Sequence, residues 1–553
     1  MRRPYRQRRI AILLFFFFLT GFVLTGRIFM LQIIHGGEYA KAAVIQRSLR
    51  HVYATGRGQI LDRNGTSLLD TRWEPALVSF SPGLEDDSHQ VLAQYELDDE
   101  NSVHVIRNVD ASTFRQLQDN PIPGLIPIHE EDRYGPNTLA PHITGYIQPH
   151  ATRKKAPNYV ELTYRAMSGL ERYFDASLSA SRPSALAVVM DGQGRLIDGL
   201  GFREWSESNI RRPYNVVTTI DRNIQAVVEQ IGRRTMESGA IVVLDPKNGD
   251  ILAMASFPDF SPRLLYRGIS AQDYSQLDSN PHTPFVNKAI QKYSPGSVFK
   301  VVLAAAALEN RLDHRETYTC TGSIEVGDRT ISCYQGNVHG EVDLKKALAV
   351  SCNAYFIQLG QQLGRETVIE TAQQFTLGRT AGLPLSSESP GNIPTPEELP
   401  FLGDLANASI GQGLVETTPL QLARMMAAIA NQGRDVYPRL VSEITDKNGT
   451  TVRRFPVQYG ARVTAPATAR LLTSMMQEVV TSGTARDAAS PYYTAAGKSG
   501  TAQTGREGES YYWFAGFAPM EDPLVVAVFI ESRRGFSAPA VFRQVMEAIL
   551  PLK

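Results

Sequence analysis

The amino-terminal segment restricts the fold most strongly, because it cannot be buried in a water-soluble domain. Residues 1–9 contain five arginines and no acidic residue, and the seventeen residues 10–26 carry no charge. At about 1.5 Å per helical residue these seventeen would extend about 26 Å, and continuing to residue 34 adds about 12 Å. This exceeds the roughly 30 Å hydrocarbon core of a bilayer. We therefore expect a transmembrane helix over residues 10–34, with Arg27 reaching outward to a membrane surface.

The arginines also predict the orientation of this helix. Basic residues beside a membrane segment favour the cytoplasmic side, so residues 1–9 are expected in the cytoplasm and the chain after residue 35 outside it. A cleaved signal peptide is the alternative, because Ala40-Lys41-Ala42 has the small-x-small pattern of a cleavage site. That pattern lies far beyond the phenylalanine-rich run, and the apolar segment is longer than a signal core. We favour a retained anchor.

The composition of the whole chain excludes several classes of protein. The 553 residues include 56 Lys plus Arg and 56 Asp plus Glu. This zero net charge gives no reason to expect a nucleic-acid partner. With 43% hydrophobic residues the chain can bury large cores, and only three cysteines exclude a disulfide-dense scaffold. We expect folded domains outside the membrane.

Two regions follow the anchor. Residues 35–210 alternate turns with strand-like runs such as 76–80 and 185–190, which favours an elongated α+β pedestal. Residues 211–553 have the pattern of one large domain. Strands are expected at 240–244, 251–255, 511–517 and 524–531, and helices at 298–308, 344–363 and 420–430. The order of strands, helices and strands predicts an antiparallel sheet completed by both ends of the domain, with helices on its faces.

The first candidate catalytic element begins at Ser297, just after the Pro295-Gly296 turn and before the apolar run 301–308. Lys300 lies one helical turn further on the same face. A serine hydroxyl is a weak nucleophile that needs a neighbouring base, and Lys300 can serve only if burial or a nearby positive charge removes its proton. The S-x-x-K spacing alone is common by chance.

Two further elements follow in order. Ser351-Cys352-Asn353 precedes a helical run, and Lys498-Ser499-Gly500-Thr501 lies in a strand of small residues. Ser351 could relay a proton, and the amide of Asn353 could bind a substrate backbone. Lys498 would lower the pKa of Lys300 and attract a carboxylate. The hydroxyls of Ser499 and Thr501 could hold that carboxylate.

Backbone groups complete the expected site. The N–H groups of Ser297 and Thr501 would converge on an oxyanion. Small side chains around Gly500 would leave the strand edge open to an extended peptide. Three such elements in this order are the signature of penicillin-binding proteins and class A β-lactamases, here with Cys for the usual Asp and Ser for the usual Thr.

With these elements the chain resembles a class B penicillin-binding protein, a monofunctional peptidoglycan D,D-transpeptidase. The stretch Arg57–Gly65 resembles the first pedestal motif of that family. Further similar stretches are Arg133–Pro136, His142–Tyr146, Gly169–Glu171, Thr218–Asp221, Gly411–Gly413 and Thr418–Ala423. The resemblance covers essentially the whole chain and implies a pedestal domain followed by a transpeptidase domain with an antiparallel sheet flanked by helices.

The resemblance also implies a reaction. The penultimate D-Ala carbonyl of a stem peptide would acylate Ser297, the terminal D-Ala would leave, and an amine of a neighbouring strand would attack. β-Lactams would acylate the same serine. The implied partner is a polytopic glycan-polymerising membrane protein that docks on the anchor and pedestal. No cofactor or metal is expected, because neither an HExxH motif nor a Cys/His cluster suggests one.

Other functions stay open at this point. A β-lactamase or a D,D-carboxypeptidase would use the same serine and lysine, although the long pedestal and retained anchor disfavour both. A catalytically silent cell-wall scaffold is disfavoured by the complete set of catalytic side chains. The sequence does not distinguish roles in elongation, division and sporulation.

The cysteines allow two interpretations. Cys320 and Cys333 bracket an expected hairpin over residues 322–331, so a disulfide between them is one option. Cys352 is interpreted as a small packed residue rather than a nucleophile. We assign His339 to a turn.

Overall fold

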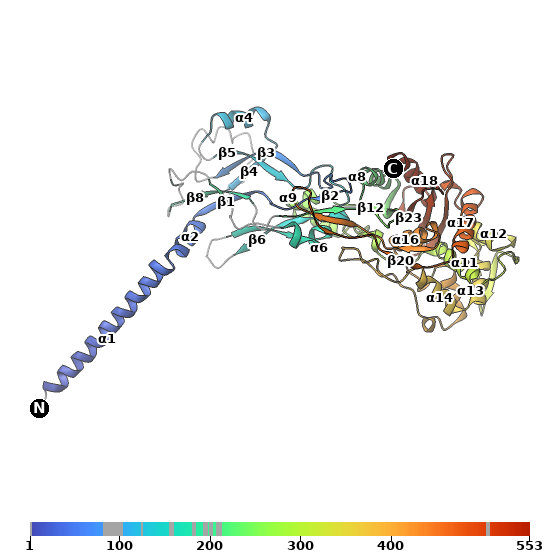
Figure 1. Ribbon diagram of the computed structural model, residues 1–553, viewed down its shortest axis with the longest axis horizontal. Helices are drawn as coiled ribbons and strands as arrows, with labels where there is room; N and C mark the ends of the chain where they lie inside the picture. Colours follow the sequence, from blue (N-terminus) through green and yellow to red (C-terminus); the bar gives the residue numbers. More distant parts are fainter. Residues whose placement is uncertain are drawn as a thin grey trace.

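The computed structural model describes residues 3–80, 103–122, 125–153, 160–179, 184–191, 197, 203–205, 213–504 and 509–553. The predicted boundary between residues 210 and 211 lies outside the described residues. Figure 1 shows an elongated molecule in which a single long helix, a β-rich pedestal and a large mixed domain follow one another along the long axis. The chain is therefore α+β, as the sequence predicts.

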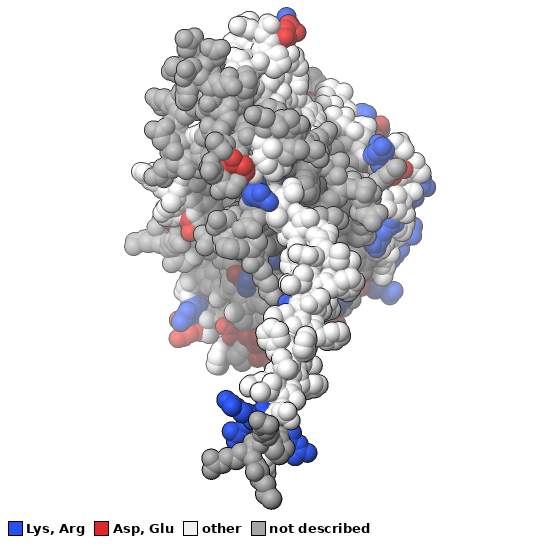
Figure 2. Space-filling model, turned by 90° about the vertical axis from the view of Figure 1, so that its left-hand side faces the viewer, with Lys and Arg blue, Asp and Glu red and all other residues white. Residues whose placement is uncertain are grey.

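The amino-terminal helix projects from the rest of the molecule. Helix α1 (Arg3–Phe29) continues into the π-helical turn η1 (Met30–Ile34), and α2 (Gly36–Gln46) follows. Residues Tyr5–Ile34 form one helix that is long and apolar enough to cross a membrane, and no residue of its most apolar 18-residue stretch is buried against the protein. In Figure 2 the white surface of this helix ends in a group of basic side chains, which include Arg6, Arg8 and Arg9.

In the described part of the pedestal, the strands form three small antiparallel sheets. One contains β1 (Ser48–Ala54), β8 (Ser184–Val189) and β9 (Arg203–Trp205), and a second contains β4 (Val103–Arg107), β3 (Arg72–Phe80) and β5 (Leu125–Asp132). The third pairs β6 (Ile147–Arg153) with β7 (Val160–Ala166). Helix α4 (Ala111–Asp119) packs on the second sheet through Phe114 and Leu117. The strands predicted at 76–80 and 185–190 are confirmed as β3 and β8.

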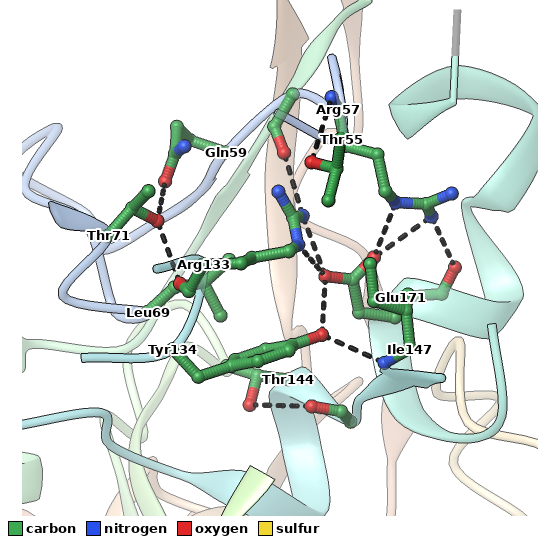
Figure 3. A network of polar contacts seen from close by, with 12 residues as sticks. Thr55, Arg57, Gln59, Leu69, Thr71, Arg133, Tyr134, Thr144, Ile147 and Glu171 are labelled. Carbon is green, nitrogen blue, oxygen red and sulfur yellow. Dashed lines mark hydrogen bonds and ion pairs between the residues drawn. The ribbon is translucent and has the colours of Figure 1, made fainter. Parts of the chain in front are cut away.

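A buried ionic network holds the base of the pedestal together (Figure 3). Glu171 in α6 (Gly169–Tyr173) accepts hydrogen bonds from Arg57 Nη2 at 2.9 Å, Arg133 Nε at 2.7 Å and the hydroxyl of Tyr134 at 3.0 Å. Burial opposes ionisation of Glu171, but the charges of Arg133 and Arg57 outweigh it, so the pKa of Glu171 lies below its usual value. Removing either arginine would leave a buried charge incompletely paired.

The pedestal and the large domain share one sheet and one hydrophobic core. Strand β2 (Ile60–Leu61) pairs in parallel with β10 (Asn215–Thr218). On its other side β10 pairs with β18 (Val441–Thr445), which in turn pairs with β19 (Thr451–Arg454). Ile60 and Val216 belong to the same buried cluster as the centre of the large domain. The two domains also meet at α9 (Pro262–Arg267), where Arg263 donates hydrogen bonds to the carboxylates of Asp132 and Glu74 in the pedestal.

The large domain is organised around a five-stranded antiparallel sheet. Its order is β12 (Ile251–Phe257), β11 (Met236–Leu244), β23 (Leu524–Arg533), β22 (Ser510–Ala518) and β21 (Ala496–Gln503). The four strands predicted from the sequence are confirmed, and both ends of the domain contribute to the sheet. Strand β21 lies at the edge of this sheet, and among the described residues no strand pairs with the other side of its backbone.

Helices cover both faces of the sheet. Successive strand residues point to opposite faces. Phe514 accordingly contacts Phe542 of α18 (Ala538–Ile549) on one face, with a ring centroid separation of 4.6 Å. Trp513 lies on the other face, where its indole N–H donates to the carbonyl of Ser294 at 3.0 Å. Helices α8 (Arg222–Thr235) and α18 pack together, and α16 (Pro419–Ala430) confirms the helix predicted at 420–430.

Two predicted helices differ in detail. The helix expected at 298–308 begins with a 3-10 turn, η4 (Gly296–Phe299), before α11 (Lys300–Glu309). The single helix expected at 344–363 is two helices, α12 (Leu344–Ala349) and α13 (Asn353–Leu363). They are separated because Ser351 has a φ of +58°, which an α-helix cannot contain. This break lies inside the second candidate catalytic element.

Candidate active site

The turn that carries Ser297 packs against two backbone segments. Gly296 has a φ of +54°, and its N–H donates to the carbonyl of Gly411 at 2.9 Å. A Cβ on Gly296 would lie 2.5 Å from the carbonyl oxygen of Thr501 in β21. Only glycine fits this left-handed position with so close a neighbour. The contact brings the backbone of Ser297 beside that of Thr501, where the sequence predicts an oxyanion site.

Lys300 is fully buried behind this turn. Its ammonium group donates to the Ser351 carbonyl at 2.8 Å, to Asn353 Oδ1 at 2.7 Å and to the Ser351 hydroxyl at 3.3 Å. The ring of Phe356 lies 5.6 Å below it. Burial lowers the pKa of Lys300 from 10.5 to about 7, against an opposing effect of nearby Cys352 and Cys333. A substantial fraction of neutral amine is therefore present near neutral pH, as a general base requires.

The second element reaches Lys300 through its unusual backbone. The left-handed conformation of Ser351 turns both its carbonyl and its hydroxyl toward the Lys300 ammonium group. The amide nitrogen of Asn353 donates to the carbonyl of Ser332 at 2.9 Å, at the end of strand β15 (Arg329–Ser332). The side chain of Asn353 therefore connects Lys300 on one side with the β14–β15 hairpin on the other, where β14 is Ser323–Val326.

The third element lies in the edge strand β21. Lys498 is fully buried and donates to the carbonyl of Ser499 at 2.8 Å. Burial and then the charge on Lys300 lower the pKa of Lys498 well below its usual value. The two amines repel each other, and burial is the main cause of the lowered pKa of Lys300. The expected effect of Lys498 on Lys300 stays a prediction.

Gly500 and Ser499 have neighbours that the sequence did not indicate. A Cβ on Gly500 would lie 2.7 Å from the carbonyl oxygen of Pro295, so this glycine is needed for the close approach of the Ser297 turn. The hydroxyl of Ser499 lies 2.8 Å from that of Thr484. Thr484 belongs to no recognisable motif. Only the folded chain shows that it lies beside Ser499 of β21.

The predicted residues meet in one groove. It has a volume of about 1670 Å³, and Phe401, Tyr512 and Arg533 are among the lining residues that the sequence did not single out. The predicted residues that line it are Ser297, Ser351, Asn353, Ser499, Gly500 and Thr501. With Lys300 and Lys498 buried beside it, the groove combines a serine hydroxyl, a lysine of lowered pKa and an open strand edge. This arrangement can perform acyl transfer through serine.

A Cys/His cluster next to the groove overturns one expectation. The sequence suggested no such cluster, yet Cys320, Cys333, His339 and Cys352 each place one ligand atom within 4.8 Å of the others. The three thiols are free, and the Sγ atoms of Cys320 and Cys333 are 3.7 Å apart, too far for a disulfide. The donor set of three sulfurs and one imidazole nitrogen suits a zinc ion.

The fold and the groove define a serine–lysine acyltransferase of the penicillin-binding class. The sequence profile of the penicillin binding protein transpeptidase domain matches residues 239–547, and that of the penicillin-binding protein dimerisation domain matches residues 53–201. The chain belongs to the penicillin-binding protein family with a transpeptidase domain. It carries one amino-terminal apolar helix and is a membrane-anchored protein.

Several characterised proteins are similar over most of the chain. The peptidoglycan D,D-transpeptidase MrdA of Acinetobacter baumannii is 29% identical across 95% of this chain and 85% of its own length. PbpA of Mycobacterium tuberculosis, also a peptidoglycan D,D-transpeptidase, is 32% identical across 66% of this chain and 78% of its own. A chain in a solved structure on the coordination of polymerization and crosslinking by a peptidoglycan synthase complex is 27% identical, covers 99% of both chains and has a TM-score of 0.72.

Proposed function

We propose that this peptidoglycan D,D-transpeptidase cross-links stem peptides through an acyl-enzyme on Ser297. The observation that carries the proposal is the buried Lys300, whose lowered pKa and contacts with Ser351 and Asn353 lie beside the Ser297 turn. A neutral lysine at this point can accept the hydroxyl proton of Ser297 as the serine attacks a carbonyl carbon.

The remaining residues bind and orient the substrate. An extended peptide that ends in D-Ala-D-Ala would lie along the edge of β21, paired through its main chain. The hydroxyls of Ser499 and Thr501 would hold its terminal carboxylate, with Lys498 close behind them. The N–H groups of Ser297 and Thr501 would stabilise the tetrahedral oxyanion.

Ser351 completes the proton path. As the acyl-enzyme forms, the C–N bond to the terminal D-Ala breaks, and the proton taken by Lys300 passes through the Ser351 hydroxyl to the departing amine. The amine of an acceptor strand then attacks the ester carbonyl and returns the proton by the reverse path. The products are the free Ser297 hydroxyl and a new peptide bond that cross-links the two strands.

The test is covalent labelling of the full-length protein by a fluorescent penicillin. Ser297→Ala should lose the labelled band, whereas Ser294→Ala, which alters a neighbouring hydroxyl, should keep it. Peptide mapping should find the acyl group on Ser297. Labelling that persists in Ser297→Ala would refute the site. Rapid hydrolysis of the penicillin with no lasting band would favour the β-lactamase alternative.

We further propose that the arginine-rich tail lies in the cytoplasm and the catalytic domain outside it, and that a glycan-polymerising membrane protein docks on α1 and the pedestal. The exposed apolar surface of α1 and the similarity to a chain from a peptidoglycan synthase complex support this partner. Co-purification from detergent extracts should recover the polymerase with the full chain. Replacing α1 by an unrelated membrane helix should weaken recovery.

A further inference from the structure

The direction of a bound stem peptide follows from the groups that would hold its end. In the proposed complex the N–H of Thr501 binds the oxyanion, and the hydroxyls of Ser499 and Thr501 bind the terminal carboxylate. The terminal D-Ala therefore lies toward Ser499, and the preceding residues run along β21 toward Gln503. Gln503 and its cross-strand neighbour Ser510 both line the groove, so the groove continues past the reacting bond in this direction.

This continuation of the groove is bordered by Tyr512 and Arg533. Tyr512 of β22 pairs directly with Thr501 of β21, so the two side chains share one face of the sheet. Arg533, at the end of β23, lies over the Tyr512 ring, with its guanidinium carbon 4.5 Å from the ring centroid. Both side chains line the groove. The ring therefore holds a cation beside the path of the peptide.

The guanidinium group of Arg533 is available to an anion. Among the described residues no carboxylate forms an ion pair with it. The neighbouring carboxylates have other partners: Glu531 accepts a hydrogen bond from Ser238, and Glu237 accepts one from Ser532 at 2.9 Å. Because the planar guanidinium group matches the two oxygens of a carboxylate, a substrate carboxylate is the anion that suits this position.

The other Asp and Arg side chains that line the groove do not offer the same site. They are Asp328, Arg329, Asp404 and Asp487. The three aspartates would repel a carboxylate, and Arg329 lies in the β14–β15 hairpin rather than in the five-stranded sheet. Arg533 is therefore the lining arginine that belongs to the sheet along whose edge the peptide would lie.

We propose that Arg533, stacked on Tyr512, binds a carboxylate on the side chain of the stem-peptide residue that precedes D-Ala-D-Ala. This inference rests on the proposed function of the groove. Strands in a sheet lie about 4.8 Å apart, so a peptide on the edge of β21 lies about 10 Å from β22. Only a long side chain can meet the guanidinium group across that span. A diamino acid whose side chain ends in a carboxylate, such as meso-diaminopimelate, fits this requirement, whereas L-lysine has the same chain without the carboxylate.

Two penicillins that differ by one carboxylate test this pairing. The aminoadipoyl side chain of the first ends in a carboxylate and an ammonium group, and the aminovaleryl side chain of the second lacks only the carboxylate. Acylation of the full-length protein, measured by competition with a fluorescent penicillin, should be about fivefold faster with the aminoadipoyl compound. Arg533→Gln should bring the ratio of the two rates close to one. Equal rates in the unaltered chain, or an unchanged ratio in Arg533→Gln, would overturn the proposal.

Matched variants separate the carboxylate contact from a general loss of structure. Arg534→Gln alters the adjacent exposed arginine and should keep the ratio, as should Arg329→Gln. Loss of the ratio in Arg329→Gln with its retention in Arg533→Gln would place the carboxylate on the hairpin and refute the inference. Tyr512→Leu should lower the ratio, whereas Tyr512→Phe should preserve it, because the ring holds the guanidinium group in place.

Failure of this inference and failure of the proposed function give different results. Absence of acylation by both penicillins in the unaltered chain would refute the acyl-enzyme, whereas acylation by both at equal rates would refute only the role of Arg533. Stem peptides with meso-diaminopimelate or L-lysine before D-Ala-D-Ala provide a second readout. The first peptide should halve the rate of fluorescent labelling at a lower concentration than the second, and Arg533→Gln should abolish this difference. Equal protection of the unaltered chain by the two peptides would contradict the inference.

Discussion

In the proposed mechanism, the pKa of Lys300 determines the pH at which Ser297 can be acylated, and the size of this effect follows from the lowered pKa. With a pKa near 10.5, about one Lys300 in 3,000 would be neutral at pH 7. With the pKa at about 7, about half is neutral, a gain of about 1,500-fold in active base. At about 1.4 kcal/mol per pKa unit, this shift corresponds to about 5 kcal/mol. Burial of the ammonium group supplies it.

The sign of the pH dependence follows from the lowered pKa. Below pH 7, acylation should fall about tenfold per pH unit, and above pH 7 it should level off. Stability should change in the same direction. The unfolded chain binds a proton at this lysine up to its ordinary pKa of about 10.5, whereas the folded chain loses it near pH 7. The contribution of Lys300 to folding stability therefore rises from pH 7 toward pH 10.5, and its full cost is present below pH 7.

The assay is the second-order rate of acylation by a fluorescent penicillin between pH 5 and 9, with full-length protein. Lys300→Arg keeps a cation of similar reach, but a guanidinium cannot become a base in this range. It should lower the rate by at least about a thousandfold at every pH. Lys247→Ala removes an exposed lysine of the same domain and should leave the profile unchanged. A profile without an inflection near pH 7, or an active Lys300→Arg variant, would refute the reasoning.

Two further predictions concern packing. Arg133→Met should lower the free energy of unfolding by about 3–5 kcal/mol, because Glu171 loses a buried partner. Chemical denaturation measures this change. As a control, Arg172→Ala, at an exposed neighbouring position, should change the free energy of unfolding little. Gly500→Ala should slow acylation, since its Cβ would meet the Pro295 carbonyl at 2.7 Å. Gly403→Ala, where a Cβ meets open space, serves as the control, and equal rates in the two glycine variants would contradict the packing argument.

Local patterns predicted the regular elements well and the breaks between them less well. The apolar strands 240–244 and 524–531 are confirmed because their composition and turns act within a few residues. The helix expected at 344–363 is interrupted at Ser351, where contacts with Lys300, 51 residues away, stabilise a left-handed backbone. Helical periodicity contains no information on such a contact.

The same reason explains the parts of the site that were missed. Thr484 and the Cys/His cluster are ordinary residues until β21, the hairpin of β14 and β15, and α13 come together. Each cysteine was interpreted singly, as one half of a disulfide or as a packed residue. Their meeting within 4.8 Å of one another depends on how four separate segments fold together.

The sequence by itself determined the apolar anchor, the order of the strands and helices, and the identity of the three candidate catalytic elements. These depend on composition and short-range spacing. The tertiary structure decided the lowered pKa of Lys300, the close packing of the Ser297 turn on β21, the core shared with the pedestal and the meeting of three cysteines and a histidine. Desolvation and ligand geometry are set by which distant residues surround a group, and only the folded chain brings those residues together.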